Sequence, residues 1–277
     1  MKAPSLVVVA LVAVAFAGVA QAGPLSTLYL TYIDYLSPAT SHIDVVQGNS
    51  ITSFPEAYNA PNEVPIAVWG DVRTTGYSPG GVGGQYKLGG TPTGTSYVLP
   101  SPISNAFDST SDGSHNYLVD YNSGVVYQTA RDFTNPTALF GLGAGNGWFG
   151  ITYDKANNSL WISSYTNPTV ADYSLTGTLL SSFSTGHVEN NALALDPADH
   201  TLWLVDDDQS GSNPLYGNLE QYSTAGVRLS FGPFIGTALG GEFNLAPATI
   251  TAEPGTLILL GSGILGIAGV LRRKINL

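Results

Sequence analysis

A short acidic segment carries the most specific pattern of possible metal ligands in the sequence. Asp206, Asp208 and Ser210 stand at alternate positions, and a glycine follows them. Calcium-binding loops space their oxygen ligands in this way and use a glycine for the sharp turn. Such loops also need a bidentate Glu at the twelfth position, where Gly217 stands, so Glu220 would have to reach in from the next strand. The segment predicts either a Ca²⁺ site or a solvated acidic loop at a strand end.

A second set of possible ligands consists of carboxylates and amides at or just before short apolar segments. These are Glu63, Asn105, Asn146, Glu189, Asn190, Asn191 and Glu242, with Trp148 among them. Four of them are candidate catalytic residues of a channel site: Glu63, Glu189, Asn190 and Glu242. If the apolar segments are neighbouring strands, these four groups converge and can hold a divalent cation that activates water. The same side chains also cap strand ends and bind water. The four histidines His42, His115, His187 and His200 show no metal-ligand spacing.

An internal repeat indicates which elements would position these groups. Asp154 and Asp196 are 42 residues apart, each in a hydrophobic segment, and Trp161 and Trp203 are again 42 residues apart. Identical intervals at two anchors are hard to obtain by chance. We expect the two tryptophans to pack between neighbouring units, and the residues after each Asp to form the turn between first and second strands. Weaker copies have strand-like segments at 66–69, 85–88 and 97–99, then at 106–108, 117–119, 125–127 and 138–140.

Each unit resembles the blade of a β-propeller, because it contains four short antiparallel strands in roughly 40 to 50 residues. Residues 23–250 accommodate five such blades. The first unit has only three strands, at 28–32, 42–46 and 51–54, so we expect 241–245 to supply its inner strand and close the propeller. A six-bladed ring and a two-sheet sandwich are the alternatives. The hydrophobic-Asp and Leu-Trp spacing resembles that of bacterial NHL and lactonase-type propellers. The lactonase type would imply a metal-dependent lactonase or esterase with a central-channel site, if the channel candidates converge.

The N-terminus has the pattern of a secretory signal peptide. Lys2 precedes an apolar run over 6–17, and Ala20 and Ala22 form an A-x-A cleavage site. We therefore expect residues 1–22 to be removed. A permanent N-terminal anchor is the alternative.

The C-terminus, residues 251–277, has the order of a sorting signal. Glu253-Pro254 precedes an uncharged run from Gly255 to Leu271, and the basic end Arg272, Arg273 and Lys274 follows. As a helix this run reaches about 25 Å, enough to span a bilayer with its basic end on the cytoplasmic side. A buried helix of the soluble domain is the alternative. The segment resembles the PEP-CTERM signal of exported Gram-negative proteins, although Ala252 replaces the first proline of the family's Pro-Glu-Pro.

That resemblance implies a temporary anchor in the inner membrane, cleavage near Glu253-Pro254 by an exosortase-type enzyme, and delivery to the cell surface or medium. It implies nothing about the activity of residues 23–250.

Composition limits the function classes further. The 33 Gly, 17 Pro and 15 Tyr favour short strands and turns, and the absence of cysteine excludes disulfides and thiolate metal sites. Five of the nine Lys and Arg and nineteen of the twenty Asp and Glu fall in residues 23–250, so the formal charge of the domain is −14. Such a surface repels nucleic acid and anionic lipid. Two hypotheses remain: a non-enzymatic, exported propeller that binds an extracellular polysaccharide or surface protein, with no cofactor or only Ca²⁺, and the lactonase-type hydrolase.

Overall fold

The computed structural model describes residues 20–21, 23–32, 42–58, 62–208 and 216–247. Contacts divide the chain into two units, 1–245 and 246–277. The first unit is all-β over its described residues, with no α-helix among them. Across the described part of the chain no helix has the length and hydropathy needed to cross a membrane. The predicted span Gly255–Leu271 and the sorting residues Glu253, Pro254, Arg272, Arg273 and Lys274 lie outside the described residues.

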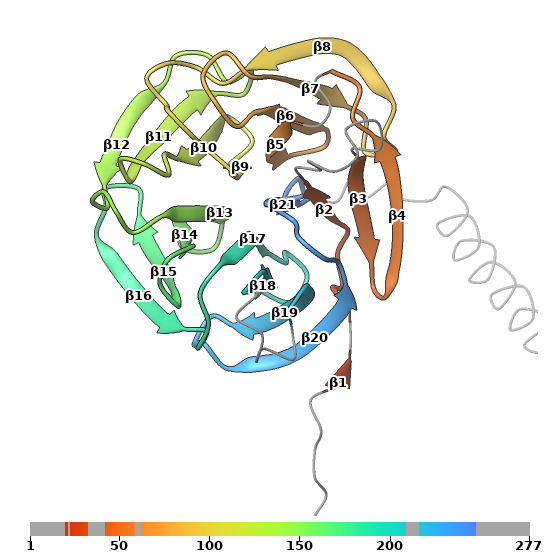
Figure 1. Cartoon of the computed structure of the whole chain (residues 1–277), viewed down its shortest axis with the longest axis vertical. Helices are drawn as coiled ribbons and strands as arrows, with labels where there is room; N and C mark the ends of the chain where they lie inside the picture. Colours follow the sequence, from red (N-terminus) through yellow and green to blue (C-terminus); the bar gives the residue numbers. More distant parts are fainter. Residues whose placement is uncertain (1–19, 22, 33–41, 59–61, 209–215, 248–277) are drawn as a thin grey trace, which may run out of the picture. The chain divides into compact units, whose positions relative to one another are not determined.

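The first unit is a β-propeller of five four-stranded antiparallel blades (Figure 1). The first blade contains β21 (Gly240–Phe243), β2 (Leu28–Thr31), β3 (His42–Gln47) and β4 (Ser50–Pro55). The second contains β5 (Glu63–Val68), β6 (Val72–Gly76), β7 (Val82–Tyr86) and β8 (Pro92–Val98). The third contains β9 (Ser109–Ser111), β10 (His115–Val119), β11 (Val125–Ala130) and β12 (Thr137–Gly141). The fourth contains β13 (Trp148–Asp154), β14 (Ser159–Ser164), β15 (Thr169–Ser174) and β16 (Leu179–Ser184). The fifth contains β17 (Asn190–Leu195), β18 (Thr201–Asp206), β19 (Asn218–Ser223) and β20 (Arg228–Phe234).

Most of the predicted strands are confirmed, and the differences are local. The predicted inner strand 241–245 corresponds to β21, which pairs antiparallel with β2. Strand β6 was not predicted, because Val-Arg-Thr-Thr-Gly carries little apolar character. The prediction of a strand at 106–108 was wrong, since β9 begins at Ser109. A short strand β1 (Ala20–Gln21) pairs in parallel with β20, although we expect these two residues to be removed with the signal peptide.

The hydrophobic core lies between the blades. The inner strands β5, β13 and β17 are buried at every position, whereas the outer strands β4 and β16 are largely exposed. Trp161 packs between the fourth and fifth blades, in a cluster with Leu193, Leu204 and Tyr222. This confirms the predicted packing of that tryptophan. Trp203 is fully buried in the largest core cluster.

Hydroxyl and carboxylate side chains connect inner strands of adjacent blades. The Thr110 hydroxyl accepts a hydrogen bond from the Tyr153 amide at 2.9 Å, and the Thr152 hydroxyl accepts one from the Leu195 amide at 3.1 Å. Both bonds join residues 43 apart in the sequence, close to the repeat interval. Neighbouring inner strands belong to different sheets and share no backbone ladder, so these side chains supply partners that a continuous sheet would otherwise provide.

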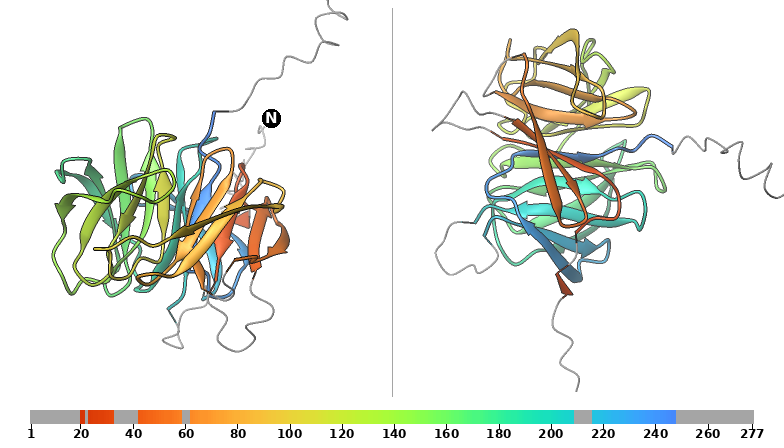
Figure 2. Two further views of the ribbon diagram at one scale, coloured as in Figure 1. Left: turned by 90° about the horizontal axis from the view of Figure 1, so that it is seen from above. Right: turned by 90° about the vertical axis from the view of Figure 1, so that its right-hand side faces the viewer.

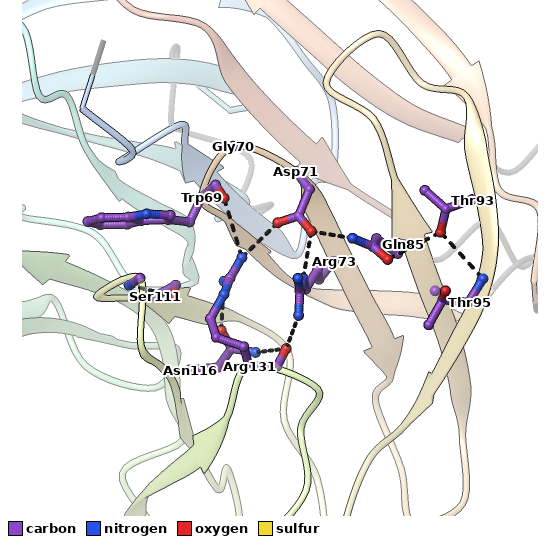
Figure 3. A network of polar contacts seen from close by, with 12 residues as sticks. Trp69, Gly70, Asp71, Arg73, Gln85, Thr93, Thr95, Ser111, Asn116 and Arg131 are labelled. Carbon is purple, nitrogen blue, oxygen red and sulfur yellow. Dashed lines mark hydrogen bonds and ion pairs between the residues drawn. The ribbon is translucent and has the colours of Figure 1, made fainter. Parts of the chain in front are cut away.

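An arginine network joins the second and third blades (Figure 3). Asp71 accepts hydrogen bonds from Arg73 Nε at 2.8 Å and from Arg131 at 2.7 Å, and Gln85 donates to the same carboxylate. Arg131 also donates to Asn116 Oδ1 at 2.9 Å. Two of the five cations of residues 23–250 are therefore committed to holding blades together.

Candidate binding site at one mouth of the propeller

The inner strands β5, β13 and β17 all begin with an irregular segment at the same end of the propeller, which we call the mouth. The ladder with the second strand shifts register between Glu63 and Ile66, between Trp148 and Ile151, and between Asn191 and Ala194. Bulges of this kind turn side chains away from the regular alternation. Figure 2 shows the strands running between the two ends of this unit. The recurrence in three blades explains why polar groups near the inner-strand starts come together at the mouth.

Five aromatic rings form a continuous array across one side of the mouth. Tyr77 stacks on Phe107 with ring centroids 5.9 Å apart, Phe107 on Phe149 at 4.6 Å, and Phe149 on Tyr165 at 5.4 Å. Tyr121 meets Phe107, Phe149 and Tyr165 edge-on. The three tyrosines lie one or two residues after the second strand of their blade, and they are partly exposed. This array, the aromatic side of the mouth, presents phenol groups and ring edges on rigid strand ends.

Carboxylates and amides form the adjoining acidic side. The Glu189 amide donates to the Tyr165 carbonyl at 2.6 Å, and the Glu189 carbonyl accepts from the Asp207 amide at 3.1 Å. The Asp207 carboxylate accepts hydrogen bonds from Thr237 at 2.9 Å and from Asn191 at 3.3 Å. Glu189 has a φ of 58°, which is uncommon for a residue with a side chain and indicates a backbone held by its surroundings.

The pKa values of Asp207 and Glu189 are both raised above those of the free acids. Burial, together with the nearby charges of Glu189 and Asp206, raises the pKa of Asp207 to about 6, against hydrogen bonds from Thr237 and Asn191 that lower it. Burial also raises the pKa of Glu189; a hydrogen bond from Tyr165 lowers it in part, and Asp208 and Asp206 raise it. Carboxylate oxygens accept hydrogen bonds and side-chain amides both donate and accept them, so this side of the mouth suits a ligand with hydroxyl groups.

The candidate channel residues are not brought together as one ligand set. Glu242 is fully buried and accepts hydrogen bonds from Thr152 and the Phe243 amide. Glu63 is also fully buried and accepts from the Tyr58 amide, Thr74 and Tyr86. Glu189 lies at the mouth, and Asn190 donates to backbone carbonyls, including that of His187 at 3.0 Å. Within the described ranges Glu63, Glu189 and Glu242 form no group of three ligands with their atoms within 4.8 Å of one another.

The predicted acidic loop is described only in part. Asp206 Oδ1 accepts the Asp208 amide at 3.0 Å, and Ser210 lies outside the described residues. Asp206 belongs instead to a group with Glu220 and His187, whose ligand atoms lie within 4.8 Å of one another. The suggestion that Glu220 reaches toward Asp206 thus agrees with the geometry. His187 was missed, since its contact depends on strand register and not on local spacing.

The opposite end of the propeller contains a cavity of about 400 Å³ with mostly apolar walls. Its lining residues include Tyr153, Leu195, Pro197 and Leu245. His200 also lines it and contacts the buried Asp154 carboxylate at 3.0 Å. This end supplies a matched position for control substitutions.

Comparisons with known proteins support the fold and go no further. No family model and no curated protein matches the sequence. A chain in the crystal structure of a nidogen/laminin complex is similar over 80% of this chain and 100% of that chain, with 15% identity and a TM-score of 0.52. A streptogramin B lyase structure is similar over 76% of this chain and 74% of that chain, with 18% identity and a TM-score of 0.44. The class that fold and mouth define is therefore an all-β, five-bladed propeller with an aromatic and acidic mouth.

Proposed function

We propose that this chain is an exported, non-enzymatic propeller that binds a neutral polysaccharide of the cell surface or matrix through its mouth. The observation that carries the proposal is the meeting of the aromatic side with the acidic side at Tyr165 and Glu189. Sugars present apolar ring faces and hydroxyl groups, and this mouth offers aromatic surface beside carboxyl and amide groups. The −14 charge of residues 23–250 favours a neutral ligand over an anionic one.

The route to the surface rests on the two ends of the sequence. A chain cleaved after Ala22 enters the periplasm, is held transiently by residues 255–271, and is processed by an exosortase near Glu253-Pro254. The β2–β21 pairing by which we propose that the propeller closes lies between the two cleavage sites. Mass spectrometry of cell-surface material tests this route: we expect an N-terminus at Gly23 and no peptides from 257–271. Peptides that run through 257–271 would indicate a permanent anchor.

Binding is tested by affinity electrophoresis and calorimetry with a panel of neutral polysaccharides such as dextran, mannan and xyloglucan. We expect Tyr165→Ala and Glu189→Gln each to weaken binding about tenfold, which corresponds to about 1.4 kcal/mol. His200→Gln, at the opposite end, is the matched control and should bind like the parent. If no neutral polysaccharide binds, or if both mouth variants bind like the parent, the proposal is wrong. A lactonase and esterase screen of the same preparations tests the hydrolase alternative.

A further inference from the structure

Three side chains from separate segments of the fifth blade meet beside the mouth. His187 lies in the connection before β17, Asp206 ends β18, and Glu220 lies in β19. His187 Nδ1 is 3.3 Å from Asp206 Oδ1, and His187 Nε2 is 3.2 Å from Glu220 Oε2. Both carboxylate side chains are fully buried, and the imidazole is 11% exposed. The register of the sheet brings these side chains together, because Asp206 pairs with Asn190 and Glu220 pairs with Leu204.

With His187 neutral, as a metal ligand must be, this set carries excess negative charge. Two buried carboxylates then face one ion-paired cation among the described residues, Arg228, whose NH1 lies 3.5 Å from Glu220 Oε1. Glu220 Oε1 accepts no hydrogen bond within the described residues, and neither does the buried Oδ1 of Asn190, the strand neighbour of Asp206. Buried acceptors without partners are destabilising. A bound cation would compensate the negative charge.

The spacing of the ligand atoms suits a small divalent ion. Ligands that each lie about 2.1 Å from a metal are about 3.0 Å apart at a right angle and about 3.4 Å apart at a tetrahedral angle. His187 would give the metal one nitrogen, either Nδ1, which lies 3.3 Å from Asp206 Oδ1, or Nε2, which lies 3.2 Å from Glu220 Oε2. One ligand atom of each of the three residues lies within 4.8 Å of those of the other two, so small side-chain adjustments would bring the third ligand into range. The Tyr222 hydroxyl donates to Glu220 Oε2 and would hold this carboxylate from outside the metal shell.

We propose that His187, Asp206 and Glu220 form a binding site for a divalent transition-metal ion such as Zn²⁺ or Mn²⁺. The imidazole ligand disfavours Ca²⁺, which takes oxygen ligands. Since His187 is two residues before Glu189, the ion would fix the connection that carries the acidic side of the mouth. The site is independent of the polysaccharide proposal, because metal binding can be measured with no other ligand present.

Protonation of His187 is the alternative to metal binding at this site. Burial alone would lower the pKa of His187, but the hydrogen bond to Glu220 and the charges of Asp206 and Glu220 raise it above its usual value. A protonated imidazole bridging two carboxylates would account for the contacts without a metal. Titration of the protein with metal ions distinguishes a bound metal from a protonated His187.

The test uses the full-length chain, stripped with EDTA and titrated with ZnCl₂, MnCl₂ or CaCl₂ at pH 7.5 by calorimetry and thermal denaturation. We expect one Zn²⁺ or Mn²⁺ ion per chain, a rise in Tm of several degrees, and much weaker binding of Ca²⁺. His187→Gln and Glu220→Gln should each raise the Kd about 100-fold or more.

The matched control is His200→Gln, which removes another histidine paired with a buried carboxylate and should leave the metal affinity unchanged. Circular dichroism confirms folding of each variant, and Asp206→Asn serves as a third ligand variant if Glu220→Gln does not fold. The proposal is overturned if the folded parent binds neither Zn²⁺ nor Mn²⁺, if it prefers Ca²⁺, or if the folded ligand variants keep the parent affinity.

Discussion

The substitution Glu56→Gln tests the electrostatics of a buried carboxylate pair below the mouth. Glu56 is 8% exposed, its Oε2 lies 3.4 Å from the Glu63 amide, and its Oε1 accepts no hydrogen bond among the described residues. Glu63 instead accepts hydrogen bonds from Thr74 at 2.6 Å and Tyr86 at 2.8 Å. Burial, with repulsion from Glu63, raises the pKa of Glu56 to about 9 from the ordinary 4.5. Glu56 is therefore neutral in the folded chain at pH 7.

A raised pKa stabilises the fold only at low pH. The contribution is complete below pH 4.5, where folded and unfolded chains both bind the proton, and it is lost as the pH rises toward 9. At 1.36 kcal/mol per pH unit, the loss at pH 8 is on the order of 5 kcal/mol. Glutamine resembles the neutral acid and has no proton to lose. The gain in stability of Glu56→Gln over the parent should thus grow from near zero at pH 4.5 to on the order of 5 kcal/mol at pH 8.

Urea denaturation of the parent and Glu56→Gln at pH 5 and pH 8 measures this difference. Asp132→Asn is a contrasting control: hydrogen bonds from Thr134 lower the pKa of this exposed carboxylate, so its removal should give no gain at pH 8. A stability difference for Glu56→Gln that stays flat between the two pH values would refute the reasoning. So would a loss of stability at pH 8.

Two other substitutions test the contacts between blades. Trp203→Ala should lower the free energy of unfolding by about 3–5 kcal/mol, since Trp203 is fully buried in the largest core cluster; a loss below 1 kcal/mol in urea denaturation would contradict that packing. Asp71→Asn should cost roughly 2–4 kcal/mol, because Arg73 and Arg131 would lose their shared carboxylate, whereas exposed Asp199→Asn should cost little. Thermal denaturation compares the two Asp variants, and equal Tm values would argue against a stabilising role for the arginine network.

Much of the fold could be predicted from the repeat, because the anchor residues have physical roles in a blade. Asp154 and Asp196 close the turn after an inner strand by accepting backbone amides two residues later. Trp161 packs between the fourth and fifth blades, and Trp203 is fully buried in the largest core cluster. The second strand β6 could not be found in this way. Arg73 donates to Asp71 and to the Arg131 carbonyl of the third blade, and Thr74 donates to Glu63 within its own blade. The strand therefore lacks the apolar alternation that usually indicates burial.

The candidate site was only partly predictable, because contacts between residues far apart in the sequence do not follow from local spacing. His187 and Glu220 are 33 residues apart, and only the register of β17, β18 and β19 brings them together. The aromatic side of the mouth had a signal that could have been found. Tyr77, Tyr121 and Tyr165 follow successive second strands at intervals of 44 residues, in step with the repeat.

Carboxylates near the starts of inner strands have two physical uses that look the same in the sequence. Asp108 is fully buried, yet it accepts amide hydrogen bonds from Ser109, Ile151 and Gly241, which belong to three different inner strands. It supplies hydrogen-bond partners at the centre, where inner strands of different blades share no backbone ladder. Glu242 accepts hydrogen bonds from its neighbour Phe243 and from Thr152 of another blade. Glu189 has a similar place in its own blade but remains partly exposed and turns through a positive φ. Exposure at the mouth, and not residue type or spacing, therefore separates a carboxylate that can meet a ligand from one that completes the core.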